Sequence, residues 1–407
     1  MKTVLIVNQF AIPPARSGGT RHHVLAKGLV KQGYRVVLLT SSSNYATGDV
    51  GSGGTVPSEV VEGVEYLYVR QTGGGHSLAR RLWAMLHFSV HVVRARKRLA
   101  ARPDIVLGSS PSLFAAVGAA LLARRLGVPF VLEVRDLWPL SLIEILQVSA
   151  HHPLVLTMAR LEAWLYRTAR AVVTPLENAK RHIDRVAGTP KQVLVIPNGV
   201  DPDLFGALER PIPRPDGVLT AIYAGAHGPA NALDVYVEAA HRLQARGESR
   251  VRLRFYGNGS DRERLMAKAK ALGLRNIGFC LPVPKERMAG VLAEGDVFLI
   301  NIPASPLYAY GFSPNKLFDY MYAGRPLLIG TDVRDNPVSR ADGGQVLAPD
   351  DPDALADALV AMCEQPHEER IRQGQNARRY VEEHHNMPEL SKRLEHLLRT
   401  VIEEGQA

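Results

Sequence analysis

The sequence predicts an α/β protein made of two doubly wound, Rossmann-like domains that face a central cleft. Short runs rich in β-branched residues alternate with stretches of helical periodicity, as in parallel strands joined by crossover helices. The alternation restarts after a segment rich in Pro and Asp that ends at Pro215 and is typical of a linker. With 407 residues, 46% of them hydrophobic, the chain is long enough for two buried cores.

The first domain is expected to cover residues 1–197, the linker 198–215 and the second domain 216–385. The strands predicted in the first half are Val4–Val7, Arg35–Thr40, Val64–Val69, Ile105–Gly108, Phe130–Val134, Ala171–Thr174 and Val193–Ile196. Those predicted in the second half are Leu219–Tyr223, Arg252–Tyr256, Val297–Ile300 and Pro326–Ile329. Helical segments near 353–364, 367–384 and 388–403 follow. Sheets of this kind bind ligands beyond the carboxyl ends of their strands.

Composition and termini exclude several classes of protein. Two cysteines, Cys280 and Cys363, are too few for a disulfide framework, so the reducing cytoplasm is the expected compartment. The N-terminal run MKTVLIVN meets polar Asn8 and Gln9 before a signal-peptide core is complete, and it is interpreted as a first strand. No apolar stretch reaches the roughly 20 residues that a membrane-spanning helix requires.

The net charge of +9 is concentrated in the first half of the chain. Residues 1–200 carry 24 Lys and Arg against 11 Asp and Glu, whereas residues 201–407 carry 25 against 29. A nucleic-acid-binding protein more often shows a basic stripe interleaved with aromatic residues, or a recognisable reading module. Neither is found, so no nucleic-acid partner is expected.

The segment YGFSPNKLFDYMYAGRP, residues 310–326, predicts a helix whose first turn can hold a phosphate-bearing ligand. Ser313 suits the N-cap and Pro314 the first helical position. At 100° per residue Asn315, Lys316 and Asp319 share one face. Leu317, Phe318 and Met321 lie on the opposite, core-facing side. The lysine can meet a phosphate while the carboxylate accepts hydrogen bonds from sugar hydroxyls. The alternative is a surface helix with a chance Lys/Asp pair.

Together with the runs VIPNGVDPDLF from Val195 and YAGAHGPANALD from Tyr223, this segment resembles the retaining nucleotide-sugar glycosyltransferases of family 4. That family has the two-domain GT-B architecture, and the resemblance covers nearly the whole chain. The SPNKLFDYM form is similar to a subgroup of bacterial surface-polysaccharide transferases of the N-acetyl-fucosaminyl transferase type. In similar proteins the final helix, here residues 386–407, crosses back to the N-terminal domain.

The chain departs from the family pattern at two places. The family carries two acids eight residues apart, and Asp319 matches the second while Gly311 stands where the first would be. Arg and Lys are typical after the first strand of the second domain, where this chain has Ala226 and Asn231. The resemblance implies that Lys316 supplies the missing phosphate cation.

The resemblance also implies a donor site. Its residues are Gly18, Gly19, Gly225, Gly257, Leu281, Ser313, Asn315, Lys316 and Asp319. Gly18 and Gly19 open a helix after the first strand, and family members place this loop over the donor diphosphate. An ordinary strand-to-helix turn is the alternative. The absence of G-x-G-x-x-G argues against a nicotinamide dinucleotide. Leu281 follows a strand in a run, FCLPV, that resembles the loop lining the base.

Arg135 and Asp136 directly follow a predicted strand, at the end where sites assemble. The alternative is a strand-end salt bridge, because a charged pair there is costly unless it is solvated or used. Similar enzymes often have His-Asp facing the acceptor at this position. Arg135 therefore implies an acceptor phosphate, and Arg135, Asp136 and Lys316 form the candidate catalytic set.

No metal ion or other cofactor is predicted. His22 and His23 lack further ligands at suitable spacing and are interpreted as solvated or capping residues. The strings Asp201-Pro-Asp203 and Asp351-Pro-Asp353 resemble a metal-binding D-x-D, but both lie in turn contexts where aspartate is common for local reasons.

The segment 77–102 has basic ends and no acid around an apolar centre, LWAMLHFSVHVV. It is either a buried crossover helix or an interfacial helix drawn to anionic lipid. With the basic first half, it favours an acceptor that is a lipid-linked diphosphate saccharide.

The predicted protein is thus a cytoplasmic, peripherally membrane-associated, metal-independent transferase. It moves a sugar with retention from a nucleotide-diphosphate donor, a UDP-sugar being favoured, to a lipid-linked or polysaccharide precursor. The missing first acid leaves no protein nucleophile and favours a front-face mechanism assisted by the leaving phosphate. Two alternatives stay open: a nucleotide-sugar epimerase of the same fold, and a non-catalytic transferase-like subunit that binds nucleotide or a partner.

Overall fold

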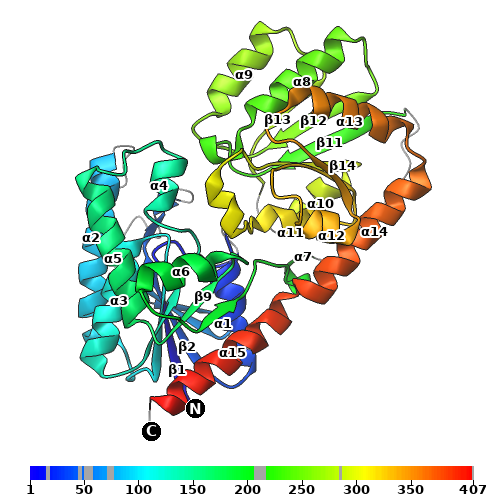
Figure 1. Ribbon diagram of the computed structural model, residues 1–407. Coiled ribbons are helices and arrows are strands. Elements are labelled where there is room, and N and C mark those ends of the chain that lie inside the picture. The colour runs from blue at the N-terminus through cyan, green and yellow to red at the C-terminus, as the bar shows by residue number, and fades with distance from the viewer. Residues whose placement is uncertain are drawn as a thin grey trace. The chain divides into compact units, whose positions relative to one another are not determined.

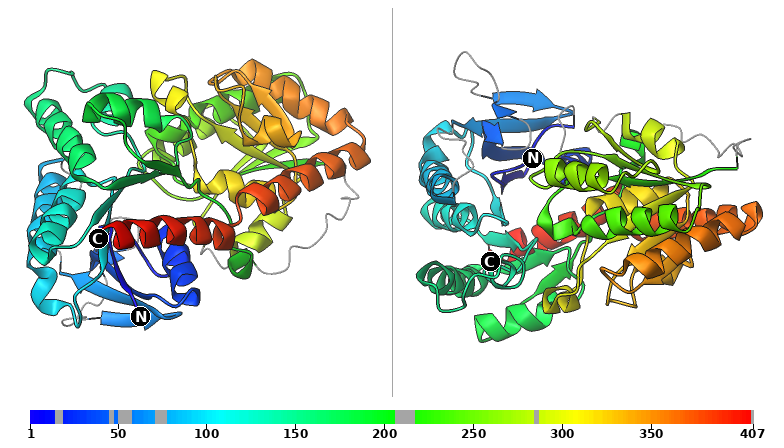
Figure 2. Two further views of the ribbon diagram at one scale, coloured as in Figure 1. Left: turned by 60° about the horizontal axis from the view of Figure 1, so that its bottom comes forward. Right: turned by 90° about the horizontal axis from the view of Figure 1, so that it is seen from above.

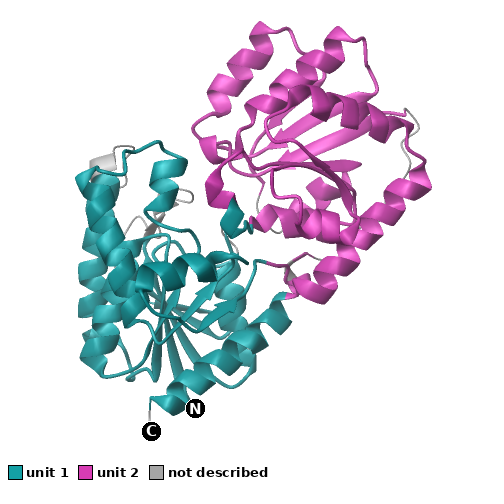
Figure 3. Cartoon of the chain, viewed as in Figure 1, with its two compact units in different colours: residues 1–198, 309–313, 387–407 teal, residues 199–308, 314–386 magenta. Residues whose placement is uncertain are grey.

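A computed structural model describes residues 1–14, 19–44, 48–49, 58–70, 78–205, 217–283 and 287–405. The chain divides into two compact units (Figure 3). Unit 1 comprises Met1–Asn198, Ala309–Ser313 and Met387–Ala407, and unit 2 comprises Gly199–Tyr308 and Pro314–Asn386. Most of the expected linker, together with Gly18 of the predicted donor site, lies outside the described residues.

Unit 1 is built on an eight-stranded sheet in the order β10-β9-β8-β7-β1-β2-β6-β5. Its strands are β1 (Thr3–Val7), β2 (Arg35–Ser41), β5 (Ser58–Val61), β6 (Val64–Val69), β7 (Ile105–Ser109), β8 (Phe130–Glu133), β9 (Ala171–Thr174) and β10 (Val193–Val195). All pairs are parallel except β5 with β6. The seven predicted strands are confirmed with ends shifted by at most one residue. The edge strand β5 was missed because its residues are largely exposed and show no apolar run.

Helices cover both faces of this sheet (Figures 1 and 2). They are α1 (Arg21–Lys31), α2 (Leu78–Arg94), the 3-10 helix η1 (Ala95–Arg98), α3 (Leu113–Leu126), α4 (Leu140–Glu144), α5 (Pro153–Thr168), α6 (Ala179–Ala187) and α15 (Met387–Glu404). α2, α3 and α5 pack in succession, while α15 lies against α1. Gly28 permits that approach, because a Cβ atom there would lie 2.3 Å from Ser391 Cβ. The C-terminal helix thus belongs to unit 1.

Unit 2 contains a wholly parallel six-stranded sheet in the order β13-β12-β11-β14-β15-β16. The strands are β11 (Leu219–Ala224), β12 (Val251–Tyr256), β13 (Ile277–Cys280), β14 (Val297–Asn301), β15 (Leu327–Gly330) and β16 (Gly344–Leu347). The four strands whose bounds were predicted are confirmed, and the two without predicted bounds, β13 and β16, are the half-buried strands at the edges. The strand order reverses between β11 and β14, which is where such sheets bind ligands.

The helices of unit 2 are α7 (Pro202–Phe205), η2 (Pro229–Asn231), α8 (Asp234–Ala245), α9 (Arg262–Ala271), α10 (Met288–Ala293), α11 (Asn315–Tyr322), α12 (Pro337–Ala341), α13 (Pro352–Glu364) and α14 (His367–His384). α8, α9 and α13 cover one face of the sheet, and α11, α12 and α14 lie on the other (Figure 1). A further 3-10 turn, η4 (Pro306–Tyr310), leads from unit 2 into unit 1. The three predicted C-terminal helices are confirmed as α13, α14 and α15.

The core of unit 2 is aromatic around β11. Tyr223 on β11 stands 5.9 Å, centroid to centroid, from both Tyr236 on α8 and Phe255 on β12. Tyr320 on α11 stacks on Phe298 at 4.7 Å, and its hydroxyl donates to the Ala224 carbonyl at 2.9 Å. These buried rings tie α11 to the carboxyl end of β11 through Tyr320.

Candidate active site

The helix α11 begins beside the point where the strand order of unit 2 reverses. Leu317, Phe318 and Met321 are buried, whereas Asn315, Lys316 and Asp319 keep partial exposure. The predicted division of the helix into a core face and a presented face is therefore confirmed. It follows from the 3.6-residue period, which depends only on the local sequence.

The predicted N-cap is wrong. The cap position is Pro314, with extended backbone angles and no side-chain cap bond, and Asn315 is the first helical residue. Ser313 belongs to unit 1, where its hydroxyl accepts the backbone N–H of Asn198 at 2.8 Å. Its backbone carbonyl also accepts the Asn198 amide. Ser313 is held by a residue 115 positions earlier in the chain, so its hydroxyl does not cap α11.

Lys316 points its amine at the end of β11. Its Nζ donates to Tyr223 Oη at 2.7 Å and to the side-chain oxygen of Asn231, and it lies 4.3 Å from the centroid of the Tyr223 ring. Among the described residues, no carboxylate forms an ion pair with this amine. Burial lowers the pKa of Lys316 to about 7. The site therefore holds a lysine that lacks a counter-ion within the described part of the chain.

Two of the predicted glycines lie beside this amine. A Cβ atom on Gly225 would stand 3.4 Å from Lys316 Nζ and 3.1 Å from Tyr223 Oη. Gly257, after β12, has φ +145°, and a Cβ atom there would lie 1.9 Å from the Gly225 carbonyl oxygen. At position 257 only glycine lets the two loops approach each other, and glycine at position 225 keeps the space next to the amine open.

The remaining donor-site residues of unit 2 are spread along the same edge of the sheet. Asn315 and Asp319 lie on the half-buried face of α11 with Lys316. Leu281 follows β13, two strands from β11, and its side chain is 74% exposed. The structure thus groups Gly225, Gly257 and Lys316 closely and leaves Leu281 at the margin.

Sequence reasoning missed His227. This residue follows β11, is fully buried, and contacts the rings of Tyr223, Phe255 and Phe279 at centroid distances of 6.0 to 6.3 Å. Neither ring nitrogen has a hydrogen-bond partner among the described residues. Burial, followed by the charges of Arg262 and Lys316, lowers its pKa to about 4, so the ring is neutral at pH 7. The only signal in the sequence was its place in the glycine-flanked run GAHG after a strand.

The predicted residues of unit 1 lie at the carboxyl ends of β1 and β8. Gly19 is exposed, two residues before α1. The backbone N–H of Arg135 donates to Ser110 Oγ at 3.1 Å, and Asp136 is exposed. Arg135 and Asp136 form no direct ion pair with one another, but the charge of Arg135 lowers the pKa of Asp136 against the larger effect of burial, which raises it.

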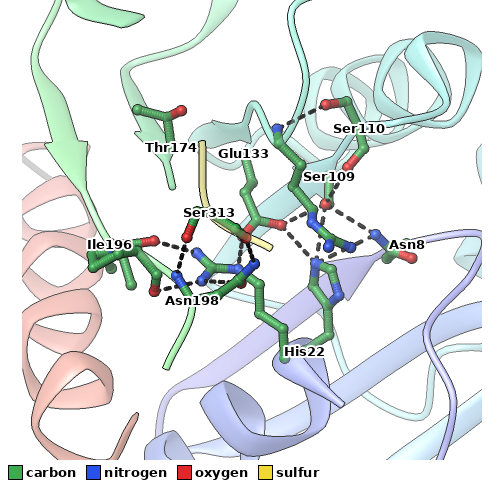
Figure 4. A network of polar contacts seen from close by, with 12 residues as sticks. Asn8, His22, Ser109, Ser110, Glu133, Thr174, Ile196, Asn198 and Ser313 are labelled. Carbon is green, nitrogen blue, oxygen red and sulfur yellow. Dashed lines mark hydrogen bonds and ion pairs between the residues drawn. The ribbon is translucent and has the colours of Figure 1, made fainter. Parts of the chain in front are cut away.

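A buried polar network in unit 1 overturns the interpretation of His22 (Figure 4), and a separate buried contact overturns that of His23. His22 Nε2 lies 2.6 Å from Glu133 Oε2 and 3.0 Å from Ser109 Oγ. His23 contacts Tyr66 Oη at 2.9 Å. Both histidines are buried rather than solvated, because the first turn of α1 packs onto the sheet. The sequence signal for this network was the acidic Glu133 at the end of an apolar strand.

Arg21 connects this network to the end of β10. Its Nε donates to Glu133 Oε1 at 2.8 Å, and its two terminal nitrogens donate to the carbonyls of Ile196 and Pro197 and to Asn198 Oδ1. Burial raises the pKa of Glu133, but His22 and Arg21 outweigh it and hold that pKa well below its usual range. Burial lowers the pKa of His22. The network therefore pairs the Glu133 carboxylate with Arg21 and places it 2.6 Å from the His22 ring.

The position of the missing acid is structurally closed to a side chain. Gly311 has φ +100°, and a Cβ atom on it would stand 2.9 Å from the backbone nitrogen of Glu177. Its neighbour Tyr310 accepts the Asn178 N–H at 3.0 Å and packs edge-on against His182. Glycine is required here because the segment 309–313 packs within unit 1, where the backbone of Gly311 comes close to that of Glu177.

The two D-P-D strings were expected to be turns, but each begins a helix: Asp201 precedes α7 and Asp351 precedes α13. Asp351 caps α13 by accepting the backbone N–H groups of Asp353 and Ala354, and Asp201 accepts the N–H of Asp203. In the described part of the chain, no group of three His, Cys, Asp or Glu side chains is placed to hold a metal ion. Within the same residues, no helix is long and apolar enough to cross a bilayer.

Comparison with known proteins agrees with this architecture. The Glycosyltransferase Family 4 profile matches residues 17–204, and the Glycosyl transferases group 1 profile matches residues 219–365. One match lies in each Rossmann-like half, so both halves resemble glycosyltransferase domains, and the two parallel-sheet units have the GT-B fold.

The individual relatives share only part of their length and sequence with this chain. The D-inositol 3-phosphate glycosyltransferase of Stackebrandtia nassauensis is 30% identical over 201 residues, 46% of this chain and 44% of that protein. The putative colanic acid biosynthesis glycosyl transferase WcaI of Escherichia coli is 26% identical over 218 residues, 49% and 51% of the two chains. The match thus spans about half the length of these relatives. The solved structure of Anabaena HepE with UDP-glucose superimposes with a TM-score of 0.68 at 14% identity, covering 98% of this chain and all of that one.

Proposed function

We propose that the protein transfers a sugar from a nucleotide-diphosphate donor to a lipid-linked or polysaccharide precursor, with retention of configuration. The observation that carries this proposal is Lys316, whose amine lies at the carboxyl end of β11 without a protein counter-ion among the described residues. A partly buried cation in this position is costly unless an anion joins it. A diphosphate would supply that anion.

The donor and acceptor classes rest on relatives and on charge. HepE was solved with UDP-glucose, which supports a UDP-sugar as the donor of this chain. WcaI is named for colanic acid biosynthesis, which supports a surface-polysaccharide precursor as the acceptor. The resemblance of SPNKLFDYM to N-acetyl-fucosaminyl transferases makes an amino sugar of that kind the finer proposal for the transferred group.

Each residue has a proposed role in this reaction. Lys316 and the first turn of α11 stabilise the leaving diphosphate, where negative charge develops in the transition state. Asp319 accepts hydrogen bonds from the ribose, and Gly225, Gly257 and Gly19 let backbone approach the donor. Asn315 and Leu281 complete the donor side, with Leu281 near the base. In unit 1, Arg135 binds a phosphate of the acceptor, and Asp136 accepts a hydrogen bond from an acceptor hydroxyl.

The reaction is proposed to run without a protein nucleophile and without a cofactor. Gly311 occupies the place of the first family acid, and its backbone angles leave no room for a carboxylate. A front-face displacement, in which the leaving phosphate assists the incoming hydroxyl, needs no such group. The same departure is what favours a non-catalytic binding subunit as the second candidate.

Peripheral association with the membrane is proposed for α2. Its exposed face carries Trp83, Leu86 and Val90, with exposed fractions of 64%, 43% and 47%, whereas Ala84, Phe88 and Val92 on the other face are buried. Arg94, Arg96, Lys97 and Arg98 follow at its end and are all exposed. An apolar stripe that ends in a basic cluster is typical of a helix lying on an anionic bilayer.

The test is Lys316→Ala, with binding of UDP-glucose measured by calorimetry at about pH 6.5, where the amine is protonated. A charge-assisted contact to phosphate contributes about 1.5–3 kcal/mol, so affinity should fall at least about tenfold. Lys270→Ala, which removes an exposed lysine from α9 of the same unit, should leave affinity unchanged. Unchanged binding by a folded Lys316→Ala protein would falsify the phosphate role.

Turnover assays separate the alternatives. A transferase releases UDP only when an acceptor is present, whereas an epimerase converts or releases the donor without one. Donor binding with no turnover on any precursor saccharide would favour the binding subunit.

A further inference from the structure

The amine of Lys316 is held by two neutral oxygen atoms from β11 and the turn that follows it. Tyr223 Oη accepts at 2.7 Å, and Asn231 Oδ1 is the second acceptor. Lys268 of α9, in the same unit, is bound differently: its amine pairs with the carboxylates of Asp234 at 3.1 Å and Glu238 at 2.8 Å. A carboxylate cancels the charge of the ammonium, whereas a hydroxyl and an amide oxygen leave it in place.

A single backbone carbonyl determines which way these two side chains face. The Tyr223 hydroxyl donates to Ala226 O at 2.8 Å, and the Asn231 amide group donates to the same oxygen at 3.0 Å. Each side chain donates one hydrogen to the Ala226 carbonyl and presents an oxygen lone pair to Lys316. The polarity of the cluster is therefore set by its own hydrogen bonds.

The groups packed around the amine add no opposing charge. Burial raises the pKa of Tyr223 and of Tyr320, and it lowers that of His227, so all three are neutral near pH 7. Asp319, one turn further along α11, is the acid of the same helix face and forms no ion pair with Lys316. An ammonium has three N–H bonds, of which two are used here.

We propose that Tyr223, Asn231 and the carbonyl of Ala226 form a neutral cradle that fixes the Lys316 amine and reserves its third N–H and its positive charge for the donor diphosphate. Tyr223 and Asn231 are then positioning residues, which act on the donor through Lys316. The inference rests on the proposed function, because it presumes that Lys316 meets the diphosphate.

Asn231→Asp is the sharpest variant, because it keeps the shape of the side chain and changes only its charge and hydrogens. The new carboxylate cannot donate to Ala226 O and would pair with Lys316 instead. Affinity for UDP-glucose at about pH 6.5 should fall at least about tenfold. The pH at which affinity declines should also rise, because a carboxylate stabilises the protonated amine. A merely structural role for Asn231 would not move that midpoint.

Two milder variants keep the test decisive if Asn231→Asp fails to fold. Asn231→Ala and Tyr223→Phe each remove one acceptor without adding charge, and each should weaken UDP-glucose binding by about threefold to tenfold while thermal unfolding stays cooperative. The matched control is Asn376→Asp on α14, which adds the same charge to a side chain whose contact is with Arg379. Its affinity and its pH midpoint should equal those of the unmodified protein.

The outcomes distinguish this inference from the proposed function. If Lys316→Ala loses binding but all three cradle variants bind UDP-glucose as the unmodified protein does, with the same pH midpoint, the cradle is wrong and the phosphate role stands. If Lys316→Ala itself binds normally, both are wrong. Loss of binding in Asn231→Asp with a raised midpoint, and not in Asn376→Asp, supports the cradle.

Discussion

At the scale of the residue, the amine of Lys316 is the group on which the proposed chemistry depends. Burial places its pKa at about 7, so protonation changes within the physiological range. The lysine is presented by α11, while its two acceptors lie 93 and 85 positions earlier in the chain. Its environment is therefore a product of folding, and small changes there should alter donor binding without unfolding unit 2.

The first prediction concerns pH. The free protein loses the Lys316 proton as pH rises through about 7, and the diphosphate of UDP-glucose does not titrate between about pH 6 and 8.5. Only the protonated amine attracts the diphosphate, so affinity is full below pH 7 and lost above it. Calorimetry should show about a 30-fold fall from pH 6 to pH 8.5. Lys316→Ala should remove most of this dependence, and a flat profile in the unmodified protein would contradict the assignment.

The second prediction concerns Gly257. Replacement by Ala imposes a left-handed backbone on a residue with a side chain and drives its Cβ atom into the Gly225 carbonyl. The cost should be about 2–4 kcal/mol of unfolding free energy, measured by chemical denaturation, with loss of UDP-glucose binding. Gly247→Ala is the control, because Gly247 has φ +72° but open space around it. It should cost only about 1 kcal/mol, and equal costs at the two sites would contradict the steric argument.

At the scale of the element, helices with similar sequence patterns have different environments. α15 buries Leu390, Leu394 and Leu398 against unit 1, as its amphipathic pattern requires. α2 buries one face against α3 but leaves Trp83, Leu86 and Val90 exposed. Because an exposed apolar stripe of this kind is unusual on a surface that faces only water, α2 is the element we expect to contact lipid.

The third prediction tests that contact. Vesicles containing an anionic lipid should sediment with the protein at low salt, and binding should fall as ionic strength rises. Changing Arg94, Arg96, Lys97 and Arg98 together to Gln, or Trp83, Leu86 and Val90 together to Ser, should abolish sedimentation while nucleotide binding stays intact.

A charge-matched control distinguishes an effect of the α2 helix from an effect of the net charge of the protein. Its four substitutions to Gln are all at exposed residues of unit 2: Arg252, Lys270, Arg275 and Arg287. This control should sediment like the unmodified protein. Equal sedimentation of all variants would leave α2 as only a crossover helix, and the acceptor need not then be a lipid.

At the scale of the whole molecule, the chain passes between the units after Asn198, Tyr308, Ser313 and Asn386. Two of these crossings are tied within unit 1 by the hydrogen bonds between Asn198 and Ser313. Within unit 2 the Val200 N–H donates to the His385 carbonyl at 2.9 Å, which ties the first crossing to the last. Arg21, through its contacts with Pro197 and Asn198, makes the buried network of unit 1 part of this arrangement.

The fourth prediction concerns metal dependence. The proposed reaction neutralises the diphosphate with Lys316 and the first turn of α11, so it should proceed in the presence of EDTA. Turnover of UDP-glucose with a precursor acceptor is the measurement, made before and after chelation. Loss of activity that Mg²⁺ or Mn²⁺ restores would show that the leaving diphosphate needs a cation the protein does not supply.

The sequence by itself determined the two sheets, eleven of their fourteen strands and the two faces of α11. These features follow from the spacing of apolar residues, which repeats every 2 residues in a strand and every 3.6 in a helix and predicts which side of the element meets the core. No bounds were predicted for the edge strands β5, β13 and β16 because their apolar pattern is weak.

Only the tertiary structure decided which side chains meet. Ser313 was expected to cap α11, but its hydroxyl accepts the backbone N–H of Asn198 instead. His22 and His23 were expected in solvent, but they are buried, with His22 bound to Glu133 and His23 bound to Tyr66. Tyr223 and Asn231 meet Lys316 in the same way, across many intervening residues. Hydrogen bonds between distant residues leave no periodic trace in a sequence, because they depend on where the folded backbone brings the chain together.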